Sequence, residues 1–179
     1  MTIDQLLEAI QLKELARAGW VRRSIDDPES VAAHSWGVAW LVLALLPEHL
    51  DLGRALTYAV LHDLPEVTVG DLTPHDAVPH DDKVRRERDA MHELAGSSPR
   101  GAALAASWDD YERGVDAEAR FVRQLDRLDM ALQAVRYAQR APDRREALIE
   151  FVQSAARVVD HPVLRPLLDE LTRRLDPDA

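Results

Sequence analysis

Cysteine is absent from this chain of 179 residues. Its absence excludes disulfides, thiolate metal sites and cysteine nucleophiles, and it leaves imidazole and carboxylate groups as the strong metal ligands. Glycine is scarce, with 7 residues, and no segment alternates apolar and polar residues as a half-buried strand does. These absences favour an all-α protein.

Long apolar runs and a signal peptide are missing as well. The longest apolar run, residues 36–46, stops before Pro47 and is too short to cross a bilayer. The N-terminus lacks a basic stretch followed by an apolar core, so we expect a cytoplasmic protein with no membrane role.

The chain also lacks an excess of positive charge. It has 22 Lys and Arg against 32 Asp and Glu, which gives a net charge of −10. Affinity for a long nucleic acid rests on neutralising phosphates, so this class of partner is disfavoured. A small anionic substrate remains compatible, because a metal and a few nearby arginines outweigh a screened global field at contact range.

Segments with apolar residues three and four apart fill most of the sequence, and 46% of its residues are hydrophobic. They predict one all-α helical bundle that spans residues 1–179 as a single domain. The predicted helices are residues 3–17, 30–46, 51–63, 81–95, 100–113, 117–140, 144–158 and 161–174. We expect the acidic tail, residues 176–179, to fray.

A His…His-Asp…Asp order is the main chemical signal. His34, the adjacent pair His62 and Asp63, and Asp126 lie on three of the predicted helices or at their ends. Their nitrogen and oxygen donors can hold one divalent cation and leave positions open for water and substrate. Neighbours on an ideal helix project about 100° apart, so His62 and Asp63 require a helix end to meet at one point. The motif predicts a hydrolase.

Each of these residues also has an ordinary structural interpretation when it is taken alone. His34 would be a hydrogen-bonded core histidine, and Asp126 would pair with Arg123 or Arg127. Asp129, one turn after Asp126, we interpret as a member of a surface ion pair.

Two carboxylates follow the His-Asp pair. Glu66 is close enough in sequence to orient an attacking water, and Asp71 could act on the leaving oxygen. Without the metal motif, Glu66 would be an ordinary first-turn carboxylate after Pro65, and Asp71 a turn residue after Gly70.

Candidate substrate contacts precede the first histidine. Trp20 could stack on a base or sugar, and Arg22 and Arg23 could hold a phosphate. The alternative is that Trp20 is a core residue.

The remaining histidines bear on the number of metal ions. His75, His80 and His92 have no compact ligand spacing, so we interpret them as surface histidines and expect one metal ion.

Four blocks in this order resemble the HD-domain phosphohydrolases, in their 5′-deoxynucleotidase group. The blocks are GWVRRSIDDPESVAAHS, VLHDLPEVTVGDLTP, DDKVRRERDAM and AEARFVRQLDRLDMALQA. The resemblance covers about residues 12–140, and we expect helices within residues 144–174 to pack on that core.

The resemblance implies a helical, usually homodimeric, metal-dependent phosphatase that removes the 5′-phosphate of deoxyribonucleoside monophosphates. The four residues of the His…His-Asp…Asp order match the family's metal ligands. Glu66 and Asp71 match its acids for water and proton transfer, and Trp20 matches the aromatic residue near the sugar. One group of the family has an arginine directly before that tryptophan, where this chain has Gly19, so the phosphate would fall to Arg22 or Arg23.

The donor set alone does not name the ion. Carboxylate and imidazole groups suit Mn²⁺, Co²⁺ or Fe²⁺ and accept Mg²⁺ or Zn²⁺. Two other functions remain open at this stage: an HD phosphohydrolase that acts on a triphosphate, cyclic or modified nucleotide, and a non-enzymatic helical binding protein.

Overall fold

The computed structural model describes residues 2–96 and 98–175, and over these residues the all-α prediction is confirmed. The predicted frayed tail lies outside them. One isolated bridge, between Ala16 and Ser30, is the extended pairing found in this part of the chain. The α-helices are α1 (Ile3–Ile10), α2 (Ala18–Arg22), α3 (Val31–Leu45), α4 (Leu52–Leu61), α5 (Glu66–Val69), α6 (His80–Ala95), α7 (Gly101–Arg113), α8 (Ala117–Arg140), α9 (Arg145–Ala156) and α10 (Arg165–Leu175). Short 3₁₀ turns are η1 (Gln11–Lys13), η2 (Pro74–Asp76) and η3 (Pro142–Arg144).

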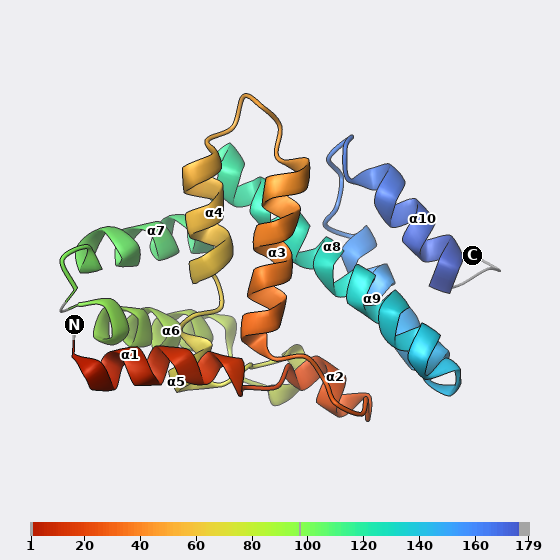
Figure 1. The fold of residues 1–179 in the computed structure, drawn as a ribbon, viewed down its shortest axis with the longest axis horizontal. Coiled ribbons are helices and arrows are strands. Elements are labelled where there is room, and N and C mark those ends of the chain that lie inside the picture. The colour runs from red at the N-terminus through yellow and green to blue at the C-terminus, as the bar shows by residue number, and fades with distance from the viewer. Residues whose placement is uncertain (1, 97, 176–179) are drawn as a thin grey trace.

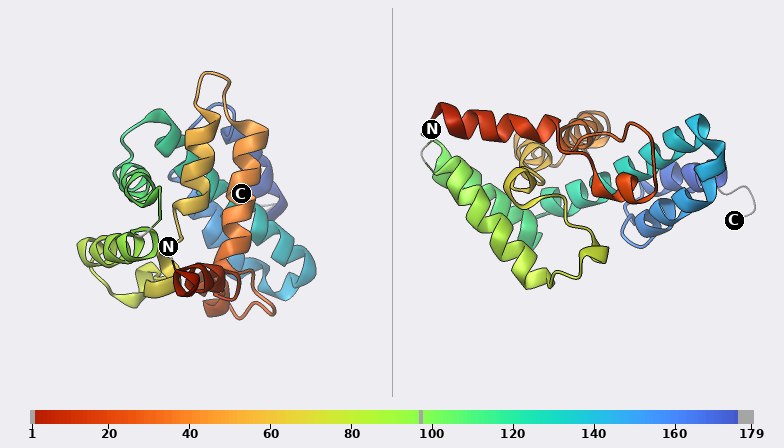
Figure 2. Two further views of the ribbon diagram at one scale, coloured as in Figure 1. Left: turned by 60° about the vertical axis from the view of Figure 1, so that its left-hand side comes forward. Right: turned by 90° about the horizontal axis from the view of Figure 1, so that it is seen from below.

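Two upright helices, α3 and α4, form an antiparallel hairpin against the long helix α8 (Figure 1). On one side of this hairpin lie α1, α6 and α7, and on the other side α9 and α10 pack on α8. The view from below in Figure 2 places α1 and α10 at opposite ends of the molecule. The centre of the fold is therefore the region where α3, α4 and α8 meet.

Side-chain caps set the start of each of these three helices. Ser30, Asp51 and Asp116 accept hydrogen bonds from the backbone N–H groups of residues 33, 54 and 119. Such caps satisfy N–H groups that have no partner within the helix. The caps fix where α3, α4 and α8 begin and thereby the turn on which each later residue falls.

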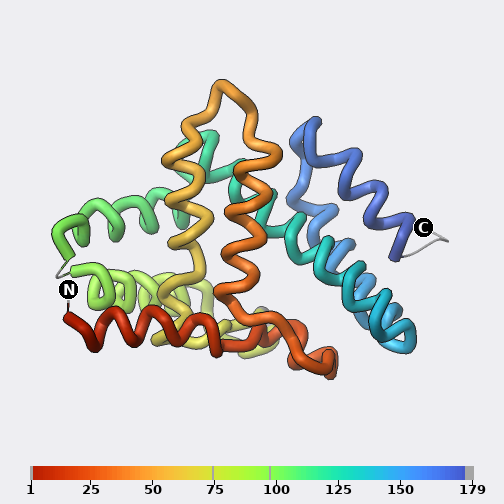
Figure 3. The backbone as a smooth tube through the Cα atoms, viewed as in Figure 1, coloured from red at the N-terminus to blue at the C-terminus, as the bar shows by residue number. Residues whose placement is uncertain are grey.

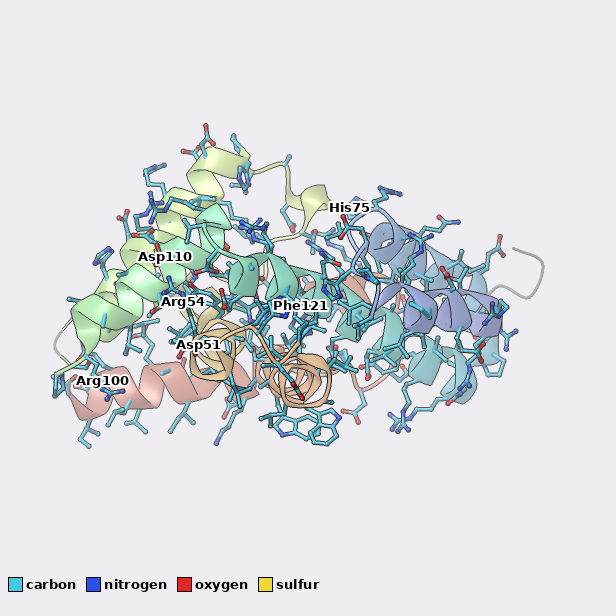
Figure 4. The ribbon with its side chains drawn as sticks, turned by 90° about the horizontal axis from the view of Figure 1, so that it is seen from above. Asp51, Arg54, His75, Arg100, Asp110 and Phe121 are labelled. Atoms are coloured by element: carbon cyan, nitrogen blue, oxygen red, sulfur yellow. The ribbon has the colours of Figure 1, made fainter. Side chains whose placement is uncertain are left out.

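The hydrophobic core runs through the whole bundle. One cluster of buried side chains extends from Trp20 on α2, through α3, α4 and α8, to Leu175 on α10. A smaller cluster around Met91 and Trp108 joins α6 and α7 to the end of α4. Polar contacts add to this packing, as between Arg54 Nη2 and Asp110 Oδ2 at 3.1 Å, two residues labelled in Figure 4 on α4 and α7.

The predicted helix over residues 3–17 is shorter in the structure. α1 ends at Ile10, a 3₁₀ turn follows, and the chain then becomes extended (Figure 3). The reason is a pairing with the segment before α3: Arg17 N–H donates to Glu29 O at 3.0 Å, and Val31 N–H donates to Leu15 O at 2.8 Å. These bonds replace helical ones, and α2 forms only after them.

The predicted helix over residues 51–63 ends early as well, with α4 stopping at Leu61. Pro65 has no N–H to donate to Leu61, so the helix cannot continue through it. A turn over residues 62–65 leads instead into α5.

No helix within residues 2–96 and 98–175 has the length and apolar character that a membrane crossing requires.

Candidate metal centre

His34 and Asp126 face each other across the contact between α3 and α8. His34 lies in the first turn of α3, one turn after the Ser30 cap, and it is fully buried. Asp126 lies in the middle of α8, and its Oδ1 is 3.2 Å from His34 Nε2. Both helices are rigidly packed at this point, so the two side chains are held in place.

His62 and Asp63 meet at one point because α4 has already ended. His62 still donates its N–H to Tyr58 O at 2.9 Å, and Asp63 is in the turn that follows. In this arrangement His62 Nε2 lies 3.3 Å from Asp63 Oδ2. The proline-limited helix end supplies the geometry that an ideal helix would not.

The ligand atoms converge. His34 Nε2 is 3.3 Å from His62 Nε2 and 3.7 Å from Asp63 Oδ2. Donors that bind one ion at about 2.1 Å lie about 3.0–3.4 Å from one another. The structure thus brings His34, His62 and Asp63 together as a possible ligand group, and Asp126 Oδ1 adjoins this group beside His34 Nε2.

The hydrogen bonds on the far side of each imidazole ring assign its free nitrogen. His62 Nδ1 lies 2.9 Å from Ala59 O, and His34 Nδ1 lies 2.7 Å from Asp129 Oδ2. A carbonyl and a carboxylate only accept, so each Nδ1 carries a hydrogen, and Nε2 is the nitrogen whose lone pair would face a bound ion. Two lone pairs and two carboxylates around one point require positive charge, which a divalent cation would supply.

The pKa values of His34 and Asp63 also indicate that this site favours positive charge. Burial and the charge of Arg17 lower the pKa of His34, but hydrogen bonds to Asp126 and Asp129 outweigh them and raise it to about 9. Burial opposes the ionisation of Asp63, yet His62 and Arg17 hold its pKa well below the usual range. The carboxylate is therefore ionised and available as a ligand.

Glu66 and Asp71, the two predicted catalytic acids, lie beside the cluster. Glu66 is only 3% exposed, and among the described residues its Oε2 has no hydrogen-bond partner. Burial, followed by the charges of Asp63 and Asp71, raises the pKa of Glu66 well above its ordinary value. Asp71 Oδ2 accepts the Ala18 N–H at 2.7 Å. Glu66 thus holds a proton more tightly than an ordinary glutamate, and Asp71 anchors the segment before α2.

Arg17 is a further residue of the site that sequence reasoning missed. Its Nη1 donates to Asp63 Oδ2 at 2.9 Å, and its Nε lies 3.9 Å from Asp71 Oδ2. Burial lowers the pKa of Arg17, but Asp63 and Asp71 outweigh burial and raise it, so the guanidinium stays charged. The sequence feature that could have indicated Arg17 is its position three residues before Trp20, in the segment considered for substrate contacts.

The three predicted substrate-binding residues have other partners. Arg22 pairs with Asp76, and Arg23 pairs with Glu150. Trp20 is 1% exposed, and it donates from Nε1 to Glu29 Oε1 at 2.8 Å. Its ring packs against Tyr137 and Phe151, as a core residue does. The structure does not bring these three side chains to the cluster.

Asp129, by contrast, lies at the cluster although the sequence placed it on the surface. The interpretation as a surface ion pair is wrong, because Asp129 bonds the buried His34. Glu29, His34 and Asp129 form a second group of possible ligands, but it uses the same histidine, whose Nδ1 already bonds Asp129. A second ion there would have to break that bond.

Of the remaining histidines, His75 and His80 are exposed, and His75 is labelled in Figure 4 on the segment between α5 and α6. His92 is exposed on α6. The possible ligand groups found among the described residues include none of the three.

Comparisons with known proteins agree with this geometry. The family model described as HD domain matches residues 9–164. The protein 5′-deoxynucleotidase HDDC2 of Bos taurus is 40% identical over 165 residues, which cover 90% of this chain and 79% of that protein. The chain spans most of that relative.

Solved structures share the fold. The PH0347 protein from Pyrococcus horikoshii OT3 superimposes with a TM-score of 0.79 at 28% identity, covering 97% of this chain and 99% of that one. A predicted metal-dependent phosphohydrolase from Magnetospirillum magnetotacticum MS-1 gives a TM-score of 0.67 at 27% identity, with 96% and 91% covered. The chain therefore belongs to the HD domain family, in the group that includes 5′-deoxynucleotidase HDDC2.

Proposed function

We propose that this protein is a metal-dependent phosphomonoesterase that removes the 5′-phosphate of deoxyribonucleoside monophosphates. The observation that carries the proposal is the convergence of His34, His62, Asp63 and Asp126, with the Arg17 guanidinium beside them. The relationship to 5′-deoxynucleotidase HDDC2 supplies the substrate class.

One divalent ion would be held by these four side chains, and Mn²⁺, Co²⁺ or Fe²⁺ suit their donor atoms best, with Mg²⁺ or Zn²⁺ as alternatives. A bound ion of this kind polarises a phosphoryl oxygen and lowers the pKa of a coordinated water. The protein's part is to hold the ligands and to keep their lone pairs turned inward.

Arg17 is the residue that we assign to the phosphate. Its charged fork lies against Asp63, next to the ligand atoms, where a phosphate on the ion could exchange with the Asp63 contact. Asp71 holds this segment through the Ala18 N–H. Trp20, Arg22 and Arg23 stay outside the proposed contacts, because their polar atoms already have partners and the Trp20 ring is buried.

Glu66 is the proposed proton carrier, because its carboxyl group is buried and holds a proton more tightly than an ordinary glutamate. Lys83 Nζ, 4.0 Å from Glu66 Oε1, is placed to stabilise the ionised form after the proton has left. Asp71 remains the second acid of the proposal, close to Arg17 and to the leaving oxygen of a phosphate bound there.

Phosphate release from a nucleotide panel tests this proposal. Chelator-stripped protein is re-supplied with Mn²⁺, Co²⁺, Mg²⁺ or Zn²⁺ and given deoxy- and ribonucleoside mono- and triphosphates. We expect metal-dependent release from the deoxy monophosphates and slower release from the ribonucleotides. Metal binding without release from any monophosphate would contradict the substrate class.

Asp63→Ala tests the metal site itself. The substitution removes a ligand whose carboxylate is ionised, so bound metal and phosphate release should both be lost. Asp81→Ala changes an exposed aspartate on α6 and serves as the matched control. Retained metal and full activity in Asp63→Ala would overturn the assignment.

The proposal extends to the whole protein. We propose one domain over residues 1–179, a cytoplasmic location and a homodimer, with no long nucleic acid as partner. The continuous hydrophobic cluster from α2 to α10 supports the single domain, and the net charge of −10 supports the absence of nucleic acid. Trp36, Trp40 and Leu43 follow one face of α3 with 71%, 56% and 58% exposure, and this apolar stripe supports a second copy as partner.

A further inference from the structure

We propose that Asp129 is a positioning residue for the metal ligand His34, and that Gly37 is the glycine that makes room for it. The inference rests on the proposed function, because it concerns the affinity of the same metal centre. It assigns a role to two residues on facing helices, α8 and α3, that bind neither the ion nor the substrate.

The first observation is the bond between Asp129 and His34. Asp129 Oδ2 lies 2.7 Å from His34 Nδ1, on the side of the ring opposite to the ligand atom Nε2. His34 is 0% exposed, so water cannot replace this acceptor. The carboxylate fixes the hydrogen on Nδ1, directs the lone pair of Nε2 toward the ion and makes the imidazole a stronger base.

The placement of the two carboxylates on α8 divides their roles. Asp126 and Asp129 are three residues apart, so they lie on one face of the helix. Asp126 approaches Nε2, and Asp129 approaches Nδ1. One face of α8 therefore contacts both nitrogens of the His34 ring. Asp126, a proposed metal ligand, lies at Nε2, and Asp129, which orients the ring, lies at Nδ1.

Gly37 is the second observation. A Cβ built on Gly37 would overlap Asp129 Oδ1 and would lie 2.9 Å from its Cγ and 3.2 Å from its Oδ2. The whole carboxyl group occupies the space that a side chain would take. A side chain at position 37 would therefore displace the Asp129 carboxyl group, and we expect this displacement to weaken its hydrogen bond to His34.

Metal affinity is the property that follows from this arrangement. Loss of a hydrogen-bond partner that orients a metal-bound histidine typically lowers metal affinity about 10–100-fold. Asp129→Asn keeps the size of the side chain but removes the charge, and Gly37→Ala adds one methyl group on the neighbouring helix. Both should weaken binding through the same bond.

The experiment measures Mn²⁺ dissociation constants without substrate for the full chain, by competition with a fluorescent chelator. We expect Asp129→Asn and Gly37→Ala to raise the constant about 10-fold or more. Asp169→Asn, an aspartate in an exposed helical pair with Arg165, is the matched control and should change it less than about twofold.

A double substitution separates the proposed route from a general loss of packing. In an Asp129→Ala background the carboxylate is gone, so Gly37→Ala should add no further loss of Mn²⁺ affinity. The ¹⁵N shifts of the His34 ring should report Nδ1–H in the wild type and a mixture of tautomers in Asp129→Ala. If Asp129 and Gly37 acted only through packing, the effects of Gly37→Ala and Asp129→Ala on Mn²⁺ affinity would be independent, and the His34 tautomer would stay the same.

The outcomes are distinct. Wild-type protein that binds Mn²⁺, with unchanged affinity in Asp129→Asn and Asp129→Ala, would overturn the positioning role and leave the proposed function standing. Additive losses in the double variant would overturn the role of Gly37. Wild-type protein that binds no divalent ion would overturn both the proposed function and this inference.

Discussion

Arg17 binds the same oxygen, Asp63 Oδ2, that would bind a metal ion. Its guanidinium neutralises Asp63 at 2.9 Å, and Asp63 Oδ2 is the same oxygen that faces the two histidines. A cation bound by that oxygen would therefore compete with Arg17, and the displaced guanidinium would be free for a phosphate. The ion pair is a natural resting position for a substrate-binding arginine.

Arg17→Met should separate metal binding from substrate binding. We expect unchanged or tighter Mn²⁺ binding, because a competing cation is gone. The specificity constant kcat/KM should fall about 10–150-fold, as a hydrogen bond to a charged group contributes about 1.5–3 kcal/mol. Steady-state kinetics and metal titration of the same samples provide the measurement.

Arg22→Met is the matched control for this prediction, since Arg22 lies in the same segment but pairs with Asp76. Its kcat/KM should remain near that of the wild type. A large loss of kcat/KM in Arg22→Met, with little change in Arg17→Met, would contradict this prediction and would assign the phosphate to Arg22, one of the two arginines suggested by the sequence.

At the residue scale, sequence reasoning proposed a ligand set whose side chains lie close together in the structure, but it did not propose the residues that support them. The order of His34, His62, Asp63 and Asp126 is recognisable because few other chemistries need two histidines and two aspartates together. Arg17 and Asp129 carry no such mark, because their partners lie 46 and 95 residues away. The role of Asp129 depends on how α3 and α8 pack, and that of Arg17 on how the segment before α2 packs against the turn after α4; the spacing of residues along the chain reveals neither.

The ends of helices, more than their middles, shape the site. α4 stops before Pro65, α5 is a single turn, and Gly70 then follows with φ 88° and ψ 155°. This backbone region is essentially restricted to glycine. The backbone after Gly70 places Asp71 against the Ala18 N–H and thus fixes the Arg17 segment against the cluster.

Gly70→Ala should cost about 1–3 kcal/mol of unfolding free energy from backbone strain alone, because no atom lies within 4 Å of the added Cβ. Activity should fall through a raised KM, with metal still bound. Denaturant unfolding and kinetics measure the two effects.

Gly53→Ala, a glycine in the first turn of α4 without positive φ, is the control and should cost less than Gly70→Ala, because its Cβ meets only the Asp51 Oδ1, at 3.3 Å. Equal stability of Gly70→Ala and the wild type would show that this turn tolerates another backbone conformation.

At the element scale, apolar periodicity predicted the long helices closely, including residues 117–140 as α8. It missed α2 and α5, which have 5 and 4 residues, because a pattern needs two or more turns to show. It also extended the first helix to residue 17, since hydrogen bonds from the segment before α3 leave no periodic signal.

The whole molecule combines a continuous core with exposed apolar residues on several helices, α3 among them. The stripe of Trp36, Trp40 and Leu43 lies on the outer face of α3, the helix that also carries His34 on its buried face. A second copy that covered this stripe would bury two tryptophans, the residue type that most often dominates interface energies.

Trp36→Glu combined with Trp40→Glu should convert a homodimer into a monomer, or raise its dissociation constant at least about 30-fold. Light scattering after size-exclusion chromatography over a concentration series measures this. Val163→Glu combined with Leu167→Glu alters exposed apolar residues elsewhere and should leave the dimer intact. Wild-type protein that is monomeric throughout the series would rule out the dimer.

The four proposed ligands, finally, would give a cysteine-free chain a removable cross-link. They come from α3, from the turn after α4 and from α8, so one bound ion would tie together positions 34, 62 and 126 of the folded chain. Because the unfolded chain does not preserve that geometry, binding adds to the free energy of unfolding, by about 4.1 kcal/mol when free metal exceeds the dissociation constant 1,000-fold. A disulfide would be permanent in an oxidising compartment, whereas this link follows the supply of metal.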